Sequence, residues 1–435
     1  MDLLLAHGIG TRTDLPIPRA LALYGAGFAV LISFAVLLLV WERPKLGDDR
    51  SGRPAPQVVQ AMVDAGPLRI ALQSVTLVLA AFVLAVALVG PDQTSRNLAP
   101  WVLYVTFWVG LVPASLLLGP VWRAANPLRL VHRALGAVVG TAPGAARLPA
   151  LGLWPAVLSL LVFVWLELVF PDRAQPSTVA VFLIGYAVLH SLAALWFGAG
   201  WFAQGDAFEV YSTLVARLSP WARRADGRLV LRNPLTNART QPAVPGLAAV
   251  VVVLLGSTAF DGVTRTQFWQ TGPGRADDTL SGTLGLLVMV GLVALLYVAA
   301  TCTVGVLSHR PPREQPGEYA HSLLPIALGY TVAHYFSLLV MDGQTTWILL
   351  SNPFDAAGTD LFGTSGNRID YGVVSTDAIA LVQVGAVVVG HVLGVLLAHE
   401  QALRASPRAR ASDQLPLVVT MVVYTVFGLG LLFGF

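Results

Sequence analysis

The chain has 435 residues, of which 55% are hydrophobic and 12% are charged, and its formal net charge is +3 at pH 7. Because average soluble domains carry roughly a quarter of charged residues, this composition excludes a water-soluble protein. The small basic excess, in which Lys45 is the only lysine, indicates membrane topology and not a surface that binds nucleic acid.

Apolar segments recur along the whole chain, and each is long enough to cross a hydrocarbon core, which takes about 20 helical residues. The pattern predicts membrane helices at 21–41, 68–90, 100–119, 152–170, 177–198, 243–260, 280–307, 321–341, 374–399 and 415–434. No segment between them is long and polar enough for a separate soluble domain. We therefore predict one transmembrane domain over residues 1–435, an all-α integral membrane bundle of about ten helices in a lipid bilayer.

Arginine and lysine separate the loops between these helices into two classes. The first, third, fifth, seventh and ninth loops hold 20 of the 27 Lys and Arg residues. The positive-inside rule places these loops in the cytoplasm of a plasma (inner) membrane, with both termini extracytoplasmic. Within the loops, 121–139 and 207–218 mix charged and apolar residues at helical spacing, which predicts amphipathic helices at the inner interface. Both loops contain Asn-Pro-Leu, which is either a common turn start or the trace of a duplicated unit.

Ionisable side chains inside the predicted helices are the best indication of chemistry, because each is costly at membrane depth unless it is paired or hydrated. Chain direction puts Glu167, His334 and Asp377 in the outer leaflet, below outer loops that carry His7 and several acids, Asp261 among them. Histidine with carboxylates is a ligand set for a divalent metal that activates water for hydrolysis.

We therefore predict Glu167, His334 and Asp377 as catalytic residues, and the same three with His7 as ligands of zinc or manganese. The alternative is that the acids cap helix N-termini and hold the outer loops without a metal.

Two further histidines, His190 and His391, fall in the inner half of their helices. Tyr186 precedes His190 by four residues and shares its helix face. A buried histidine pair is suited to binding a cofactor such as haem, to relaying protons or to joining helices by hydrogen bonds. We predict these histidines as a cofactor-binding pair and leave the three readings open.

Several blocks of sequence indicate a family. They are HGIGTRTDLPIP (7–18), VWLELVFPD (164–172), GSTAFDG (256–262), AHSLLPIALGYTVAHYFSLLV (320–340) and VVGHVLGVLLAHE (388–400). In these blocks the chain resembles actinobacterial multispanning membrane proteins that are labelled fenitrothion hydrolase, and the likeness runs over nearly the whole chain. The resemblance implies hydrolysis of a lipophilic organophosphate ester, but no catalytic residue is carried over with it.

Three functions are consistent with the sequence. The first is a membrane-embedded, metal-assisted hydrolase for a lipophilic ester. The second is a proton-coupled secondary permease for a small molecule, in which the polar groups of both leaflets line a path. The third is a haem- or copper-binding or scaffolding subunit, which would bind a membrane or extracytoplasmic partner protein through its outer termini or its arginine-rich loops.

Overall fold

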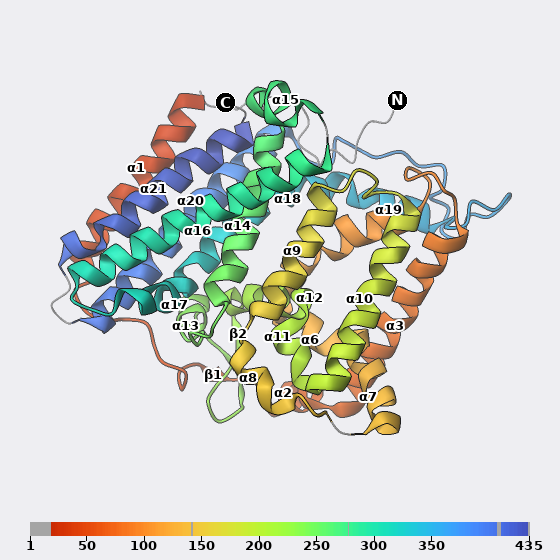
Figure 1. Cartoon of the computed structure of the whole chain (residues 1–435), viewed down its shortest axis with the longest axis horizontal. Coiled ribbons are helices and arrows are strands. Elements are labelled where there is room, and N and C mark those ends of the chain that lie inside the picture. Colours follow the sequence, from red (N-terminus) through yellow and green to blue (C-terminus); the bar gives the residue numbers. More distant parts are fainter. Residues whose placement is uncertain (1–18, 141, 277, 407–409, 434–435) are drawn as a thin grey trace.

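The computed structural model describes residues 19–140, 142–276, 278–406 and 410–433, and these form a bundle of helices (Figure 1). Within the described residues, nine helices are long and apolar enough to cross a membrane. A tenth span comes from a helix pair, Ala145–Leu151 and Trp154–Leu168, that is bent by 70°. The predicted all-α membrane bundle of about ten helices is thus confirmed.

The spanning helices follow the predicted order closely. They are α1 (Arg19–Val40), α3 (Gly66–Val89), α4–η1–α5 (Leu98–Leu118), α9 (Trp154–Leu168), α10 (Pro176–Phe197), α14 (Leu247–Thr264), α16 (Thr279–Leu307), α18 (Leu324–Met341), α20 (Thr376–Ala405) and α21 (Ala411–Phe433). The largest difference at one boundary is in α20, which is predicted to end at 399 and ends at Ala405. Helix α14 both begins and ends later than predicted, and Gly246, at φ +84°, turns the chain just before it begins. As a result Asp261 lies inside a helix and not in an outer loop.

The remaining helices and the strands are shorter. They are α2 (Gln57–Asp64), α6 (Val121–Ala125), α7 (Pro127–Val139), α8 (Leu148–Leu151), α11 (Phe202–Gly205), α12 (Ala207–Val215), α13 (Pro234–Arg239), α15 (Gln267–Thr271), α17 (Gln315–Tyr319), α19 (Gly343–Leu350) and the strands β1 (Arg53–Pro54), β2 (Trp221–Arg223) and β3 (Leu229–Leu231). The strands form an antiparallel sheet in the order β1-β3-β2. Arg223 of the sheet binds Asp64 of α2, and this hydrogen bond holds the pKa of Asp64 below its usual value.

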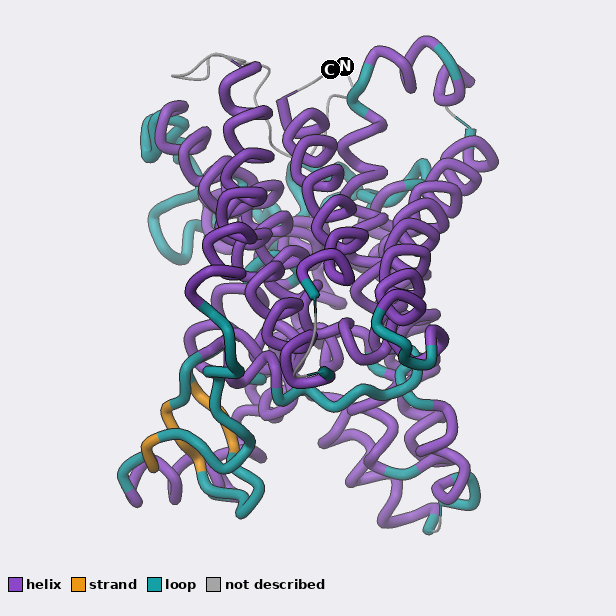
Figure 2. The backbone as a smooth tube through the Cα atoms, turned by 90° about the vertical axis from the view of Figure 1, so that its left-hand side faces the viewer, coloured by secondary structure: helices purple, strands orange, loops and turns teal. Residues whose placement is uncertain are grey.

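The helix directions give the bundle two distinct ends (Figures 1 and 2). The start of α1 and the end of α21 lie at the end that carries α15, which we call the α15 end. The elements α2, α7, α8 and the sheet lie at the opposite end, with the loops that hold most arginines; we call it the arginine-rich end.

The two predicted interfacial helices differ in the structure. Leu135 and Val138 of α7 are exposed, as an interfacial helix requires. In contrast α12 is buried along nearly its whole length, so the prediction for 207–218 is wrong. Its Phe208 packs edge-on against Phe163 of α9, with ring centroids 5.0 Å apart. Local amphipathicity did not reveal that α12 turns back into the bundle.

The two Asn-Pro-Leu sequences have the same local role. The Asn126 side chain accepts a hydrogen bond from the Leu128 amide at 3.0 Å, and Asn233 accepts one from the Leu235 amide at 2.9 Å. In each case the following proline occupies the first helical position. Helix capping therefore explains the shared motif without a duplicated unit.

Helices α18 and α20 approach so closely that glycine is required at their crossing. A Cβ atom on Gly390 would lie 2.5 Å from the Pro325 carbonyl oxygen. We expect Gly390→Ala to lower the free energy of unfolding by about 1 to 3 kcal/mol, because the helices must move apart. Thermal unfolding in detergent tests this, with Gly385→Ala as the matched control, since a Cβ there meets nothing within 4 Å. Equal midpoints for the two variants would contradict the close packing.

Candidate functional site

A buried carboxylate and a buried histidine meet between α14 and α18, towards the α15 end. The Asp261 Oδ2 and His334 Nε2 atoms are 2.5 Å apart, and both residues are buried. One turn further along α14, Arg265 donates a hydrogen bond to the same oxygen at 3.1 Å. Arg265 is half-buried at the end of α14, so it extends from the buried pair towards the α15 end. Asp261 therefore accepts hydrogen bonds from a fixed cation and from a titratable ring.

The carboxylate determines which nitrogen of His334 carries the proton. Because an ionised carboxylate only accepts hydrogen bonds, Nε2 is the donor, and the neutral ring then has its lone pair on Nδ1. Nδ1 is buried and has no hydrogen-bond partner among the described residues. His334 thus presents a proton-accepting nitrogen inside the bundle, oriented by Asp261 in the way that a carboxylate orients a catalytic or metal-binding histidine.

Glu167 of α9 belongs to the same group. Its side chain is fully enclosed, and within the described part of the chain its Oε1 atom has no hydrogen-bond partner. The Asp261 carboxylate and the Tyr335 hydroxyl lie within electrostatic range of it. The Tyr335 ring contacts the His334 ring edge-on, with centroids 4.7 Å apart. We call these residues, Glu167, Asp261, Arg265, His334 and Tyr335, the acid–histidine cluster.

The other residues of the predicted metal site are not brought to this cluster. Asp377 is exposed in the first turn of α20, where its negative charge interacts favourably with the helix dipole. His7 lies outside the described residues. Within the described ranges, no three His, Cys, Asp or Glu side chains are grouped so that they could hold a metal ion. The structure thus gathers Glu167 and His334 with Asp261, and the zinc or manganese site stays a prediction.

His190 is held at both ring nitrogens. The Trp201 indole donates to Nδ1 at 3.0 Å, so Nε2 carries the proton and donates to the Ser159 hydroxyl at 3.2 Å. The Tyr186 ring lies 4.1 Å from the imidazole, as the four-residue spacing predicts. Since both nitrogens already have partners, this geometry favours a structural role over a ligand role for His190.

Beside His190 lies a polar network that sequence reasoning missed. Asp206 caps α12 and accepts hydrogen bonds from the Tyr186 hydroxyl at 2.7 Å and the Asn126 amide at 2.8 Å. Glu209 of α12 is paired with Arg129 of α7. The acids are fully buried, and their partners lie far away in the sequence. This network ties α7, α10 and α12 together and explains why α12 is buried together with Glu209 and its N-cap Asp206.

His391 of α20 resembles His334 in leaving one nitrogen bare. Its Nδ1 donates to the Val387 carbonyl oxygen at 2.9 Å, so the neutral ring has its lone pair on Nε2. Nε2 is buried without a hydrogen-bond partner among the residues that the structure describes. The hydroxyl of Tyr330 on α18 is buried in the same condition. These groups lie deeper in the bundle than the acid–histidine cluster.

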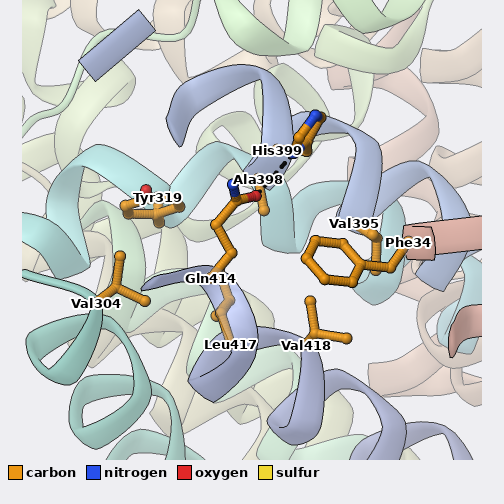
Figure 3. Close-up of a pocket in the computed structure, with 9 residues that line it drawn as sticks. All are labelled: Phe34, Val304, Tyr319, Val395, Ala398, His399, Gln414, Leu417 and Val418. Atoms are coloured by element: carbon orange, nitrogen blue, oxygen red, sulfur yellow. Dashed lines mark hydrogen bonds between the residues drawn. The ribbon is translucent and has the colours of Figure 1, made fainter. Parts of the chain in front are cut away.

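A small cavity lies between α1, α16, α20 and α21 (Figure 3). Its volume is about 10 Å³, which is room for about one water molecule. The ring of Phe34 and the hydrogen-bonded side chains of His399 and Gln414 border it. This cavity is too small for a lipophilic ester.

Comparison with models of known protein families, with curated proteins and with solved structures finds no match to this chain.

Proposed function

We propose that the protein is a proton-coupled secondary permease for a small molecule, in which the acid–histidine cluster binds the coupling proton. In this proposal the arginine-rich end faces the cytoplasm of the plasma membrane, and both termini are extracytoplasmic. The acid–histidine cluster then lies near the extracytoplasmic side. The distribution of arginines over the loops supports this orientation.

The Asp261–His334 pair is the observation that carries the proposal. A proton that reaches Nδ1 converts His334 to an imidazolium, and the adjacent carboxylate compensates the new charge. Such compensation matters because an isolated charge is costly at this depth. Arg265 competes for the same carboxylate oxygen, so protonation of His334 changes how Asp261 is shared between α14 and α18. A proton-dependent rearrangement between two helices is the coupling step that a secondary permease requires.

The depth of the polar groups favours transport over a single catalytic site. The acid–histidine cluster lies towards the α15 end, whereas Tyr330 and His391 place buried, unpartnered polar atoms further along α18 and α20. A permease needs polar groups at several levels of the membrane, and a hydrolase needs them at only one.

Proton entry into sealed vesicles tests the proposal. The protein is reconstituted in liposomes that contain a pH-sensitive dye, and a potassium diffusion potential, negative inside, drives protons inward. We expect wild-type vesicles to acidify at least fivefold faster than protein-free vesicles, because the coupling proton slips across without co-substrate. Equal rates would contradict the proposal.

A hydrolase remains the second candidate, because the Asp261–His334 geometry also suits general-base catalysis. His334 Nδ1 would take a proton from water while the water oxygen attacks phosphorus and the phenolate leaves. The same vesicles can be given fenitrothion, whose hydrolysis releases a coloured nitrophenolate. Release that is lost in His334→Gln would favour the hydrolase, and intact ester would leave the permease.

A partner protein stays a prediction on either reading. Copurification of a second chain from the native membrane, lost after substitution of the exposed arginines of the sheet, would support it. Isolation of the protein without a second chain would not support a partner protein.

A further inference from the structure

Tyr330 and His391 lie in one region between α18, α20 and α21. Tyr330 and Val387 belong to the same buried cluster, and His391 is one turn from Val387 on the same face of α20. A Cβ atom on Gly428 of α21 would lie 3.3 Å from the Tyr330 ring, so this ring faces α21. At the same level, a Cβ on Gly390 would be 3.2 Å from the Gly329 Cα. The side chains next to these two glycines therefore flank one crossing point of α18 and α20.

Three buried polar atoms of this region have complementary hydrogen-bonding character. The His334 Nδ1 and His391 Nε2 atoms are acceptors in the neutral rings, and the Tyr330 hydroxyl is both a donor and an acceptor. Each of them is unpartnered among the described residues. Buried polar groups in native proteins nearly always have a partner, from protein or from an internal water molecule. Gln383 Nε2 of α20 is a fourth such atom. Several unpartnered atoms along one helix pair thus point to a shared ligand and not to separate packing defects.

The three atoms make no direct hydrogen bonds with one another, since each lacks a partner among the described residues. The Tyr330 and His334 ring centroids are 6.3 Å apart, and the two residues are separated by about 6 Å along α18. A hydrogen bond needs heavy atoms about 3 Å apart. One water molecule between two such groups would satisfy both, as internal water typically makes about three hydrogen bonds.

We infer that internal water molecules bridge His334 Nδ1, the Tyr330 hydroxyl and His391 Nε2 in a hydrogen-bonded chain between α18, α20 and α21. The chain leads from the acid–histidine cluster towards the arginine-rich end and gives the coupling proton its route inward. This inference deepens the proposed function and rests on it for the movement of protons. The presence of the water is tested by itself.

Hydroxyl-radical footprinting by X-ray radiolysis detects water next to buried side chains, because the radical forms from the water in place. The full-length protein in lipid nanodiscs is exposed, and oxidation of each tyrosine is measured by mass spectrometry. Tyr297 is the control, since it is also buried, at 1% exposed against 6% for Tyr330, but its hydroxyl donates to the Pro316 carbonyl oxygen at 2.7 Å. We expect Tyr330 to be oxidised at least fivefold faster than Tyr297. Equal slow rates would overturn the water chain.

A second measurement separates the water chain from the permease. Tyr330→Phe removes the bridging hydroxyl and keeps the ring, so we expect proton entry to fall at least fivefold, while Tyr297→Phe retains the wild-type rate. Fast oxidation of Tyr330 in a wild-type protein that admits no protons would support the chain and refute the permease. Fast proton entry in Tyr330→Phe would refute the chain as the proton route even if Tyr330 is oxidised.

Discussion

Asp261→Asn is expected to reduce potential-driven proton entry at least tenfold. Asparagine keeps the size of the side chain but removes the charge that compensates the imidazolium of His334. Two unit charges about 4 Å apart interact by about 4 kcal/mol at an effective dielectric constant of 20, so protonation of His334 becomes much less favourable. The rate is measured in dye-containing vesicles under the potassium diffusion potential described above.

The matched control is Asp278→Asn. Asp278 is an exposed residue that caps α16 at the α15 end and accepts a hydrogen bond from the Ser281 amide at 2.6 Å. Both variants are first compared with the wild type by size-exclusion chromatography in detergent. A folded Asp261→Asn protein that admits protons at the wild-type rate would show that the pair does not bind the coupling proton.

Glu400→Ala is expected to lower the free energy of unfolding by about 3 to 5 kcal/mol, the typical effect of breaking a buried ion pair. The fully buried carboxylate of Glu400 accepts hydrogen bonds from the Trp41 indole at 2.8 Å, from two backbone amides after α1, and from the Arg404 guanidinium at 2.9 Å. These bonds join α20 to the chain that leaves α1. The alanine variant leaves the guanidinium and both amides without this acceptor. The midpoint of thermal unfolding in detergent measures the effect.

Glu314→Ala is the control for Glu400→Ala, because Glu314 is exposed and has no ion-pair partner within the described part of the chain. We expect its midpoint to stay within about 1 °C of the wild type, since surface substitutions have small effects. A Glu400→Ala protein with the same midpoint as Glu314→Ala would contradict the structural role of the buried carboxylate.

The positions of the spanning helices could be predicted from the sequence because a helix in lipid must be apolar over about 20 residues. The sequence also predicts how far Glu167 and His334 lie from the ends of their helices, since the rise per residue of a helix is fixed. The acid that pairs with His334 could not be predicted in this way. Which acid meets it depends on α14 lying between α9 and α18, and the predicted end of α14 left Asp261 in a loop.

The burial of α12 and its acids was beyond sequence reasoning for a related reason. A short segment with Glu209 and scattered apolar residues has the pattern of an interfacial helix. Its true environment depends on Arg129, which lies about 80 positions earlier in the chain. Similarly, Asp377 has the composition of a ligand, but its place in the first turn of α20 puts it at the surface.

Nitrogen-15 NMR of histidine-labelled protein in nanodiscs tests most directly the claim that His334 Nδ1 is the proton-binding atom. The signals of His334 are those missing from His334→Gln among the eight histidines. We expect the proton of the neutral His334 ring to lie on Nε2, where Asp261 accepts it, and Nδ1 to carry none. A His334 ring whose neutral form carries its proton on Nδ1 would contradict the claim.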